Sequence, residues 1–190
     1  NHENLDSKIL GFTGGRYNAA TASAVEKKTA LSAVGVSVIE VERDASGKWS
    51  VKPSKYNKRY TGNTEYKVSG PAAAAVGASV IGTLNNCASG PTPWGTYLTC
   101  EESTDNYLDP TQAEQGYGWV VEIDPLNQLG MPTKRTAMGR FDHENTAYLL
   151  DENNRVAFYM GDDGTPGCIY KFVPSKASNP ANRAANFGLL

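Results

Sequence analysis

Three pairs of ionisable residues directly follow hydrophobic segments of the 190-residue sequence. The pairs are Glu101-Glu102, His143-Glu144 and Asp162-Asp163. Loops at strand ends on one face of a β scaffold often converge on a site. Carboxylates brought together repel unless a cation lies between them, and oxygen ligands suit a hard cation such as calcium. The pattern indicates a metal site assembled from distant segments, but solvated turn residues give the same pattern, so the residues alone leave both interpretations open.

Cys87 raises a similar question, because it lies where a predicted strand meets a Gly- and Pro-rich loop. A thiolate there could bind a soft or borderline metal. A buried small hydrophobe, or half of a disulfide, is the alternative. The other cysteines are Cys100 and Cys168, so at most one pair can form within the chain. No Cys-x-x-Cys pair is present, which disfavours a structural zinc site.

The elements that must position these residues are mostly short strands. A helix is predicted over 20–33, with a capping box of Ser23 and Glu26, and a hairpin joins 36–41 to 49–51. We expect an ordered loop over 85–96. Further strands are predicted over 80–84, 96–100, 117–123, 134–141, 145–150, 155–160 and 168–173. The sequence therefore predicts an all-β sandwich, barrel or propeller with a short helical insertion near the N-terminus.

Composition and motifs exclude several classes of function. With 18 basic and 20 acidic residues and no basic patch, nucleic acid and an anionic membrane surface are disfavoured as partners. No apolar run reaches the about 20 residues of a transmembrane helix. The chain lacks the Gly-x-Ser-x-Gly elbow of serine hydrolases, the phosphate-binding P-loop and the EF-hand pattern. Any calcium site must therefore be built from separate segments.

Several longer segments carry a more specific signal than any single residue. They are 82–90 (GTLNNCASG), 92–102 (TPWGTYLTCEE), 116–125 (GYGWVVEIDP), 139–144 (GRFDHE), 156–163 (VAFYMGDD) and 169–173 (IYKFV), preceded by Asn1-His2-Glu3. In order and spacing they resemble PhoX-type alkaline phosphatases across essentially the whole chain, most closely over 82–173.

This resemblance implies a β-propeller with extra elements, in an exported enzyme that is periplasmic or extracellular. It implies hydrolysis of small-molecule phosphomonoesters by a mixed cluster of Ca2+ and Fe3+. Cys87 would be an iron ligand, and Glu102, Glu144 and Asp163 would be carboxylate ligands at the catalytic centre. Two adjacent acids, Glu101 and Asp162, are further metal-binding candidates, whereas the role of Glu3 stays unassigned.

The resemblance also implies that residues 1–190 form one incomplete domain, the N-terminal to middle part of a propeller. Six blades of about 40–45 residues each would exceed this length. A later segment of the parent chain would complete the propeller and supply another carboxylate and a phosphate-binding arginine, so these residues alone are expected to be inactive. The alternative is a non-catalytic, calcium-binding propeller module for adhesion or scaffolding.

Overall fold

The structure is a computed structural model that describes residues 1–6, 8 and 10–190. Strands dominate it, which confirms the all-β prediction. The strands are β1 (Gly35–Val38), β2 (Val41–Arg43), β3 (Trp49–Val51), β4 (Lys58–Thr61), β5 (Glu65–Ser69), β6 (Ser79–Ile81), β7 (Asn86–Pro91), β8 (Tyr97–Glu101), β9 (Val120–Ile123), β10 (Thr133–Arg135), β11 (His143–Leu150), β12 (Val156–Asp162) and β13 (Ile169–Phe172). The α-helices are α1 (Ala24–Ala33) and α2 (Ala73–Val76), and none in the described part of the chain is long and apolar enough to cross a membrane.

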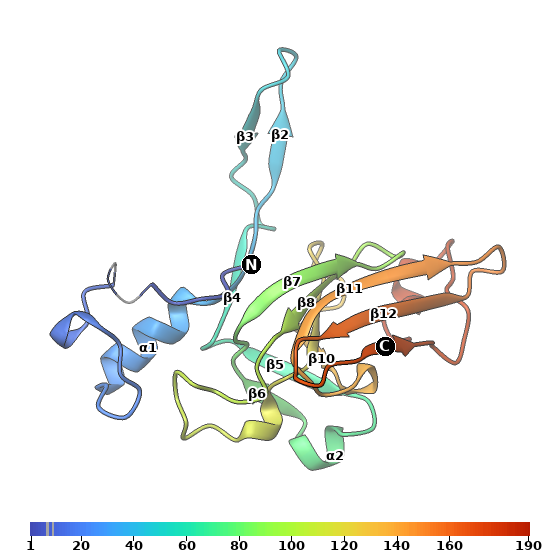
Figure 1. Ribbon diagram of the computed structural model, residues 1–190. Coiled ribbons are helices and arrows are strands. Elements are labelled where there is room, and N and C mark those ends of the chain that lie inside the picture. Colours follow the sequence, from blue (N-terminus) through green and yellow to red (C-terminus); the bar gives the residue numbers. More distant parts are fainter. Residues whose placement is uncertain (7, 9) are drawn as a thin grey trace.

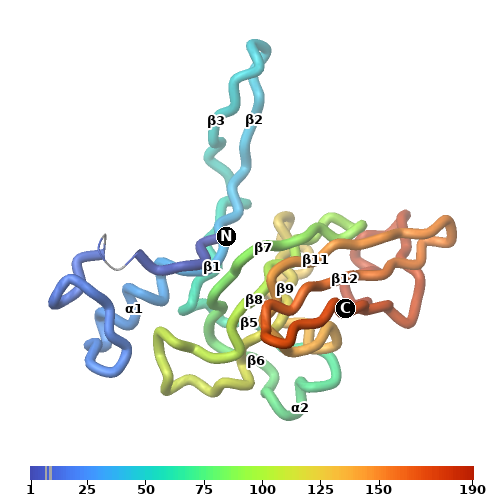
Figure 2. Tube along the Cα trace, viewed as in Figure 1, coloured from blue at the N-terminus to red at the C-terminus, as the bar shows by residue number. Residues whose placement is uncertain are grey.

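Two sheets form the body of the molecule (Figure 1). The larger has six strands in the order β6-β5-β10-β9-β8-β7, antiparallel except where β5 pairs with β10. The smaller is the antiparallel sheet β11-β12-β13. Strand β11 runs beside β7, where a β-carbon at Gly90 would lie 2.1 Å from the Thr146 backbone oxygen (Figure 2). The sheets therefore meet along β7 and β11 at a distance that only glycine permits.

One hydrophobic core joins the two sheets. Val156, Phe158 and Met160 alternate along β12 and are all buried, as expected for a strand with one face inward. They pack with Leu98 and Val120 of the larger sheet. The strands that carry the acidic pairs are thus fixed by shared apolar packing rather than by pairing within a single sheet.

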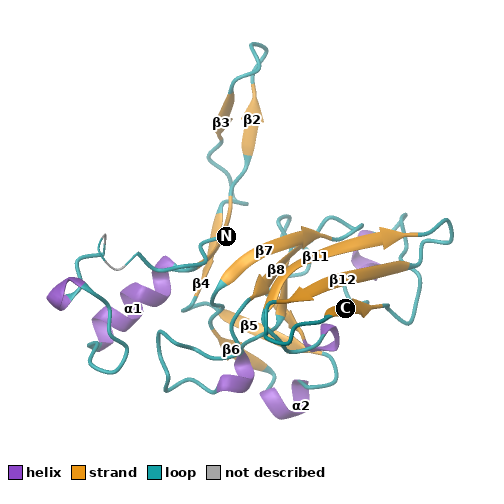
Figure 3. Cartoon of the chain, viewed as in Figure 1, coloured by secondary structure: helices purple, strands orange, loops and turns teal. Residues whose placement is uncertain are grey.

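The N-terminal part adds α1, a β1-β4 pair and the β2-β3 hairpin, which projects from the body (Figure 3). Helix α1 begins at Ala24 and has the predicted capping box, since Ser23 accepts from the Glu26 backbone and the Glu26 side chain reaches back. The predicted hairpin is confirmed in part: Val41 pairs with Val51 in β2 and β3, whereas residues 36–38 of the predicted first strand belong to β1, which pairs with β4.

Three sequence predictions are wrong in detail. The strand expected over 134–141 ends at Arg135 and gives way to a 3-10 turn at Thr136–Met138, followed by Gly139 with a φ of 95°. The expected loop over 85–96 contains β7. Gly90 is needed there because the neighbouring strand β11 lies too close for a side chain, and Pro91 is the last residue of β7. The polar stretch over 53–75 holds β4 and β5, which the sequence pattern missed.

A buried ion pair holds β10 against β8. The Lys134 ammonium lies 2.6 Å from a Glu101 carboxylate oxygen, and both side chains are fully buried. Lys134 also donates to the Gly116 carbonyl at 2.7 Å and lies over the Tyr117 ring. Burial lowers the pKa of Lys134, and the Glu101 charge opposes that shift. The two charges therefore compensate each other inside the core.

Lys134→Met should destabilise the protein by about 3–5 kcal/mol, because Glu101 would remain as a buried, uncompensated charge. The double variant Lys134→Met/Glu101→Gln should recover part of that loss. Urea denaturation of the expressed protein measures both. Lys52→Met is the matched control, since its pair with Glu40 is solvent-exposed and contributes little to stability. Equal effects at Lys134 and Lys52 would contradict a structural role for the buried pair.

Candidate metal centre

Three potential ligands from distant parts of the sequence meet at one place. One donor atom each from Glu3, Cys87 and Glu102 lies within 4.8 Å of the other two. All three side chains are half-buried. They come from the N-terminal segment, from β7 and from the residue after β8. A thiol with two carboxylates at this separation is a donor set that a metal ion could bridge.

The pairing of β7 with β8 places Cys87 and Glu102. Asn86 lies opposite Glu101, and both are buried. Successive side chains of a strand point to opposite faces, so Glu102 lies on the side of Leu98 and Cys100, opposite to Glu101, and Cys87 faces the same side. Asn85, with a φ of 50°, accepts from the Glu102 backbone N–H at 2.9 Å and donates its side chain to the Glu102 carbonyl at 3.1 Å.

Glu101 lies on the other side of this strand, which revises its predicted role as a metal ligand. Its oxygens accept from Lys134, the Thr83 hydroxyl and the Trp119 backbone N–H. Thr83 in turn accepts from the Asn86 side chain at 2.8 Å. Glu101 is therefore committed to the core, where it holds the residues that precede both Cys87 and Glu102.

The predicted ligands Asp163 and Glu144 approach the same place from the smaller sheet. The Asp163 carboxyl lies within hydrogen-bonding reach of Glu102, and Glu144 is close enough for its charge to act on Cys87. Asp163 follows β12 as predicted, whereas His143 and Glu144 open β11 instead of following a strand. Asp163 and Glu144 therefore lie near Glu102 and Cys87, but outside the group of donor atoms that lie within 4.8 Å of one another.

Asp162 and Asp142 form an acidic margin beside these residues. The Asp162 carboxylate accepts from the Gly164 backbone N–H at 2.9 Å, a turn-forming contact, so the structure gives no ligand geometry to this further candidate. Burial raises the pKa of Asp142, and the charges of Asp162 and Asp163 raise it further. Asp142 was missed because it lies in an irregular segment whose approach to Asp163 depends on pairing between β11 and β12.

Glu3 has no role that the sequence alone predicts, although Asn1-His2-Glu3 fits the same resemblance. The structure ties this segment to β1 by backbone hydrogen bonds between His2 and Gly35, 2.6 and 2.9 Å long. This pairing links residues 33 positions apart, beyond the range of any local sequence pattern. The only sequence signal for Glu3 was the resemblance of the tripeptide Asn1-His2-Glu3.

The charges in this cluster oppose one another. Burial raises the pKa of Cys87 to about 12, with further contributions from a hydrogen bond to Glu102 and from the charges of Glu102, Glu3 and Glu144. Burial also raises the pKa of Glu102, and the Glu3 and Asp163 charges add to that effect. Such a group is stabilised when a cation replaces the thiol proton. The donor set therefore fits a metal centre, with Cys87 suited to iron and the carboxylates to iron or calcium.

None of the three cysteines, all in the described part of the chain, forms a disulfide. Cys87 thus remains available as a ligand, as predicted, while Cys100 is buried and Cys168 exposed.

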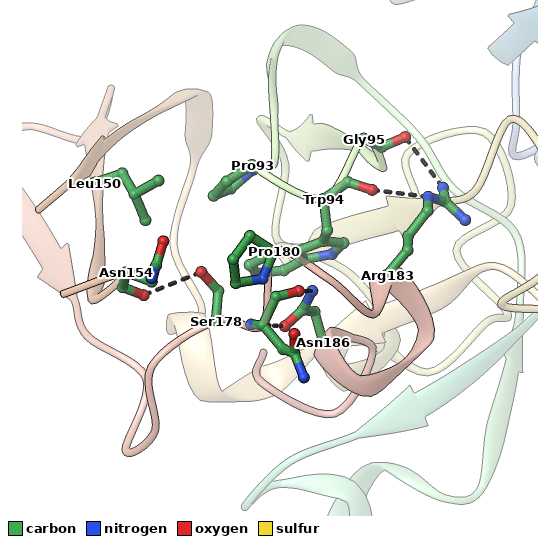
Figure 4. Close-up of a pocket in the computed structure, with 10 residues that line it drawn as sticks. Pro93, Trp94, Gly95, Leu150, Asn154, Ser178, Pro180, Arg183 and Asn186 are labelled. Atoms are coloured by element: carbon green, nitrogen blue, oxygen red, sulfur yellow. Dashed lines mark hydrogen bonds between the residues drawn. The ribbon is translucent and has the colours of Figure 1, made fainter. Parts of the chain in front are cut away.

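A cavity of about 380 Å³ lies at the opposite end of β7 and β8 (Figure 4). Trp94, Pro180 and Arg183 are among its lining residues. The Arg183 guanidinium donates to the Trp94 and Gly95 carbonyls and pairs with Asp124. These contacts occupy its donors, so the cavity is a structural feature rather than an anion site.

Replacing Glu102 with Gln should lower the pKa of Cys87 in metal-free protein, because a negative charge that disfavours the thiolate is removed. Cys87 should then react several-fold faster with iodoacetamide at mildly alkaline pH, as peptide mass spectrometry can measure. Glu144→Gln is the matched comparison and should have a smaller effect, since its charge is the weakest of the stated causes. An unchanged rate in Glu102→Gln would contradict this electrostatic description.

Comparisons with known proteins agree with this geometry. The sequence profile of the family "Alkaline phosphatase PhoX" matches residues 1–190. A solved structure of Pseudomonas fluorescens PhoX, in complex with vanadate, a transition state analogue, is 36% identical with a TM-score of 0.81. That match covers 98% of this chain and 39% of the solved chain. No match was found among curated proteins.

The chain therefore spans about two fifths of the length of its solved relative. The agreement in backbone also supports the predicted fold class, an open part of a propeller-like β structure. With the profile match extending over all 190 residues, the chain belongs to the PhoX family of alkaline phosphatases.

Proposed function

We propose that the protein containing this chain is a metal-dependent phosphomonoester hydrolase. The observation that carries the proposal is the convergence of Glu3, Cys87 and Glu102 donor atoms within 4.8 Å, in a chain of the PhoX family. The binding of vanadate, a transition state analogue, by the Pseudomonas fluorescens relative supports phosphoryl chemistry for the same fold. The substrate class is small-molecule phosphomonoesters.

In this proposal Cys87 binds Fe3+ through its thiolate, and Glu102, Glu144 and Asp163 bind Fe3+ or Ca2+ through carboxylates. Glu3 joins them as a further ligand. When bound, the cations hold the phosphate oxygens and stabilise the charge of the transition state. The carboxylates alone would repel a phosphate dianion, so their function is to hold positive charge in place.

The chain's own residues also handle a proton. Cys87 hydrogen-bonds to Glu102 and has a pKa of about 12 without a cation, so it is protonated at neutral pH. Metal binding must release this proton, and acidification should therefore weaken binding at Cys87. The half-buried setting of Cys87 and Glu102 limits their contact with water and strengthens the attraction between ligand and cation.

We assign the remaining components, a further carboxylate and a phosphate-binding arginine, to the part of the family's fold that lies outside residues 1–190. In the described chain, Arg135, Arg140 and Arg183 are hydrogen-bonded to backbone carbonyls or buried acids. This assignment makes residues 1–190 one incomplete domain without activity of its own. An exported, periplasmic or extracellular location is part of the same proposal. No contact in the described residues favours the adhesion or scaffolding alternative.

Prolonged chelation should lower the phosphomonoesterase activity of the full-length protein that contains this chain by more than about 100-fold, because the acidic site cannot accept a phosphate dianion without cations. Calcium together with iron should restore activity, measured with a chromogenic phosphomonoester. A mock-treated sample is the control. Full hydrolysis by protein shown to be metal-free would reject the proposed function.

Cys87→Ser should lower iron content and activity together while leaving the fold intact, since a hydroxyl is a poorer ligand for iron than a thiolate. Elemental analysis and circular dichroism measure the two effects. Cys168→Ser is the matched control, because Cys168 is exposed and lies outside the ligand cluster. Normal iron content in Cys87→Ser would remove Cys87 from the ligand set.

A further inference from the structure

The side chain of Asn1 forms hydrogen bonds with four groups next to the metal centre. Its amide nitrogen donates to the Cys87 and Ala88 carbonyls, both at 3.0 Å. Its amide oxygen accepts from the Tyr97 hydroxyl at 2.7 Å and from the Thr99 hydroxyl at 3.3 Å. These contacts use both donors and both acceptor positions of the amide. Few orientations of the Asn1 side chain satisfy all four partners, so its position is closely fixed.

The two carbonyls lie where the regular ladder between β7 and β8 is interrupted. The register of the pair shifts between Asn86 and Ser89, and Cys87 and Ala88 fall within that irregularity. Backbone groups in a bulge lose regular strand partners and require others. Asn1 supplies two donors at this point and thereby fixes the backbone that carries the Cys87 thiol.

The same residue lies two positions before Glu3. The intervening residue, His2, pairs with Gly35 through two backbone hydrogen bonds, so the segment is extended there. Side chains two positions apart in an extended segment point to the same side. Asn1 and Glu3 therefore face β7 together, and the Glu3 carboxylate reaches Cys87 and Glu102.

The negative charge of Glu102 opposes the placement of the Glu3 carboxylate beside it. Glu3 and Glu102 repel each other when no cation is present. The contacts of Asn1 hold the segment against β7, while those of His2 hold it to β1. A ligand that is already in place when the metal arrives binds it more tightly, because less ordering is left to occur on binding.

We propose that Asn1 is a positioning residue for the metal centre, which fixes the Glu3 carboxylate against the Cys87 thiol. This inference rests on the proposed function for the identity of the metals, but not for the placement of Glu3. Residues that orient metal ligands typically change metal affinity by about 10–100-fold when they are replaced.

The test measures metal binding by Asn1→Ala and Asn1→Asp in the expressed protein, by calcium titration and by elemental analysis of calcium and iron. Both variants should bind metal about tenfold more weakly, since Ala removes all four hydrogen bonds and Asp removes both donors. Tyr97→Phe, which removes one hydrogen bond to Asn1, should cause a smaller loss and serves if Asn1→Ala fails to fold.

Asn63→Ala is the matched control. The Asn63 amide donates to the Lys28 carbonyl and the Ser32 hydroxyl, remote from the ligand cluster. Its removal should leave metal affinity unchanged even where it lowers stability. Equal losses of metal in Asn63→Ala and Asn1→Ala would show a general effect of destabilisation and overturn the proposal.

A double-variant cycle separates positioning from a merely structural role. If Asn1 acts by placing Glu3, then Asn1→Ala/Glu3→Gln should bind metal no more weakly than Glu3→Gln. Additive losses, or normal metal affinity in Asn1→Ala, would overturn the proposal. Because metal affinity is the measured quantity, a protein that binds metal in this way but hydrolyses no phosphomonoester would refute the proposed function and leave the role of Asn1 supported.

Discussion

The proposed metal centre depends on a charge pair that lies outside it. Lys134 and Glu101 are fully buried and 2.6 Å apart, and their hydrogen bonds extend through Thr83 to Asn86. The pair and its network fix two neighbouring strand positions with their side chains inward. The next residue along each strand then faces the opposite side of the sheet, where Cys87 and Glu102 lie beside the second sheet. A core interaction thus determines the direction of two ligands that it never contacts.

The side of β8 that carries Glu102 differs in its electrostatics from the side that carries Glu101. The core places a cation against every acid it buries, as with Lys134 and Arg135. At the metal centre the carboxylates of Glu3, Glu102 and Asp163 face one another without such a partner among the described residues, and the pKa of Glu102 is raised accordingly. The protein's own lysine therefore neutralises the carboxylate on one face of β8, whereas the carboxylates on the other face would need a bound cation.

Much of this arrangement could be predicted from residue types. The acidic pairs at 101–102 and 162–163 lie at strand ends, as predicted. The prediction succeeded because the hydrophobic residues before each pair are typical of a strand. Sequence could not say which member of a pair faces the core, because that depends on the register between β7 and β8. Glu101 was therefore counted as a ligand, although Lys134, 33 positions away, holds it in the core.

The same limit explains the missed elements. Gly90 and Pro91 indicated a loop, yet they belong to a strand that lies against β11. The need for glycine at position 90 arises from the Thr146 backbone, 56 residues further along the chain, and no local pattern carries that information. The capping box, by contrast, depends on Ser23 and Glu26, which are local, and it was predicted, although the helix begins at Ala24 and not at residue 20.

The contact at Gly90 has a consequence for how this family can vary. Gly90 lies three residues after Cys87, and Thr146 lies two residues after Glu144. Since a methyl group at position 90 would have to displace β11, it would widen the gap between ligands that belong to different sheets. The spacing of the proposed ligands therefore depends on a residue with no functional group, and tolerance to substitution there measures how closely the separation of the two sheets is set.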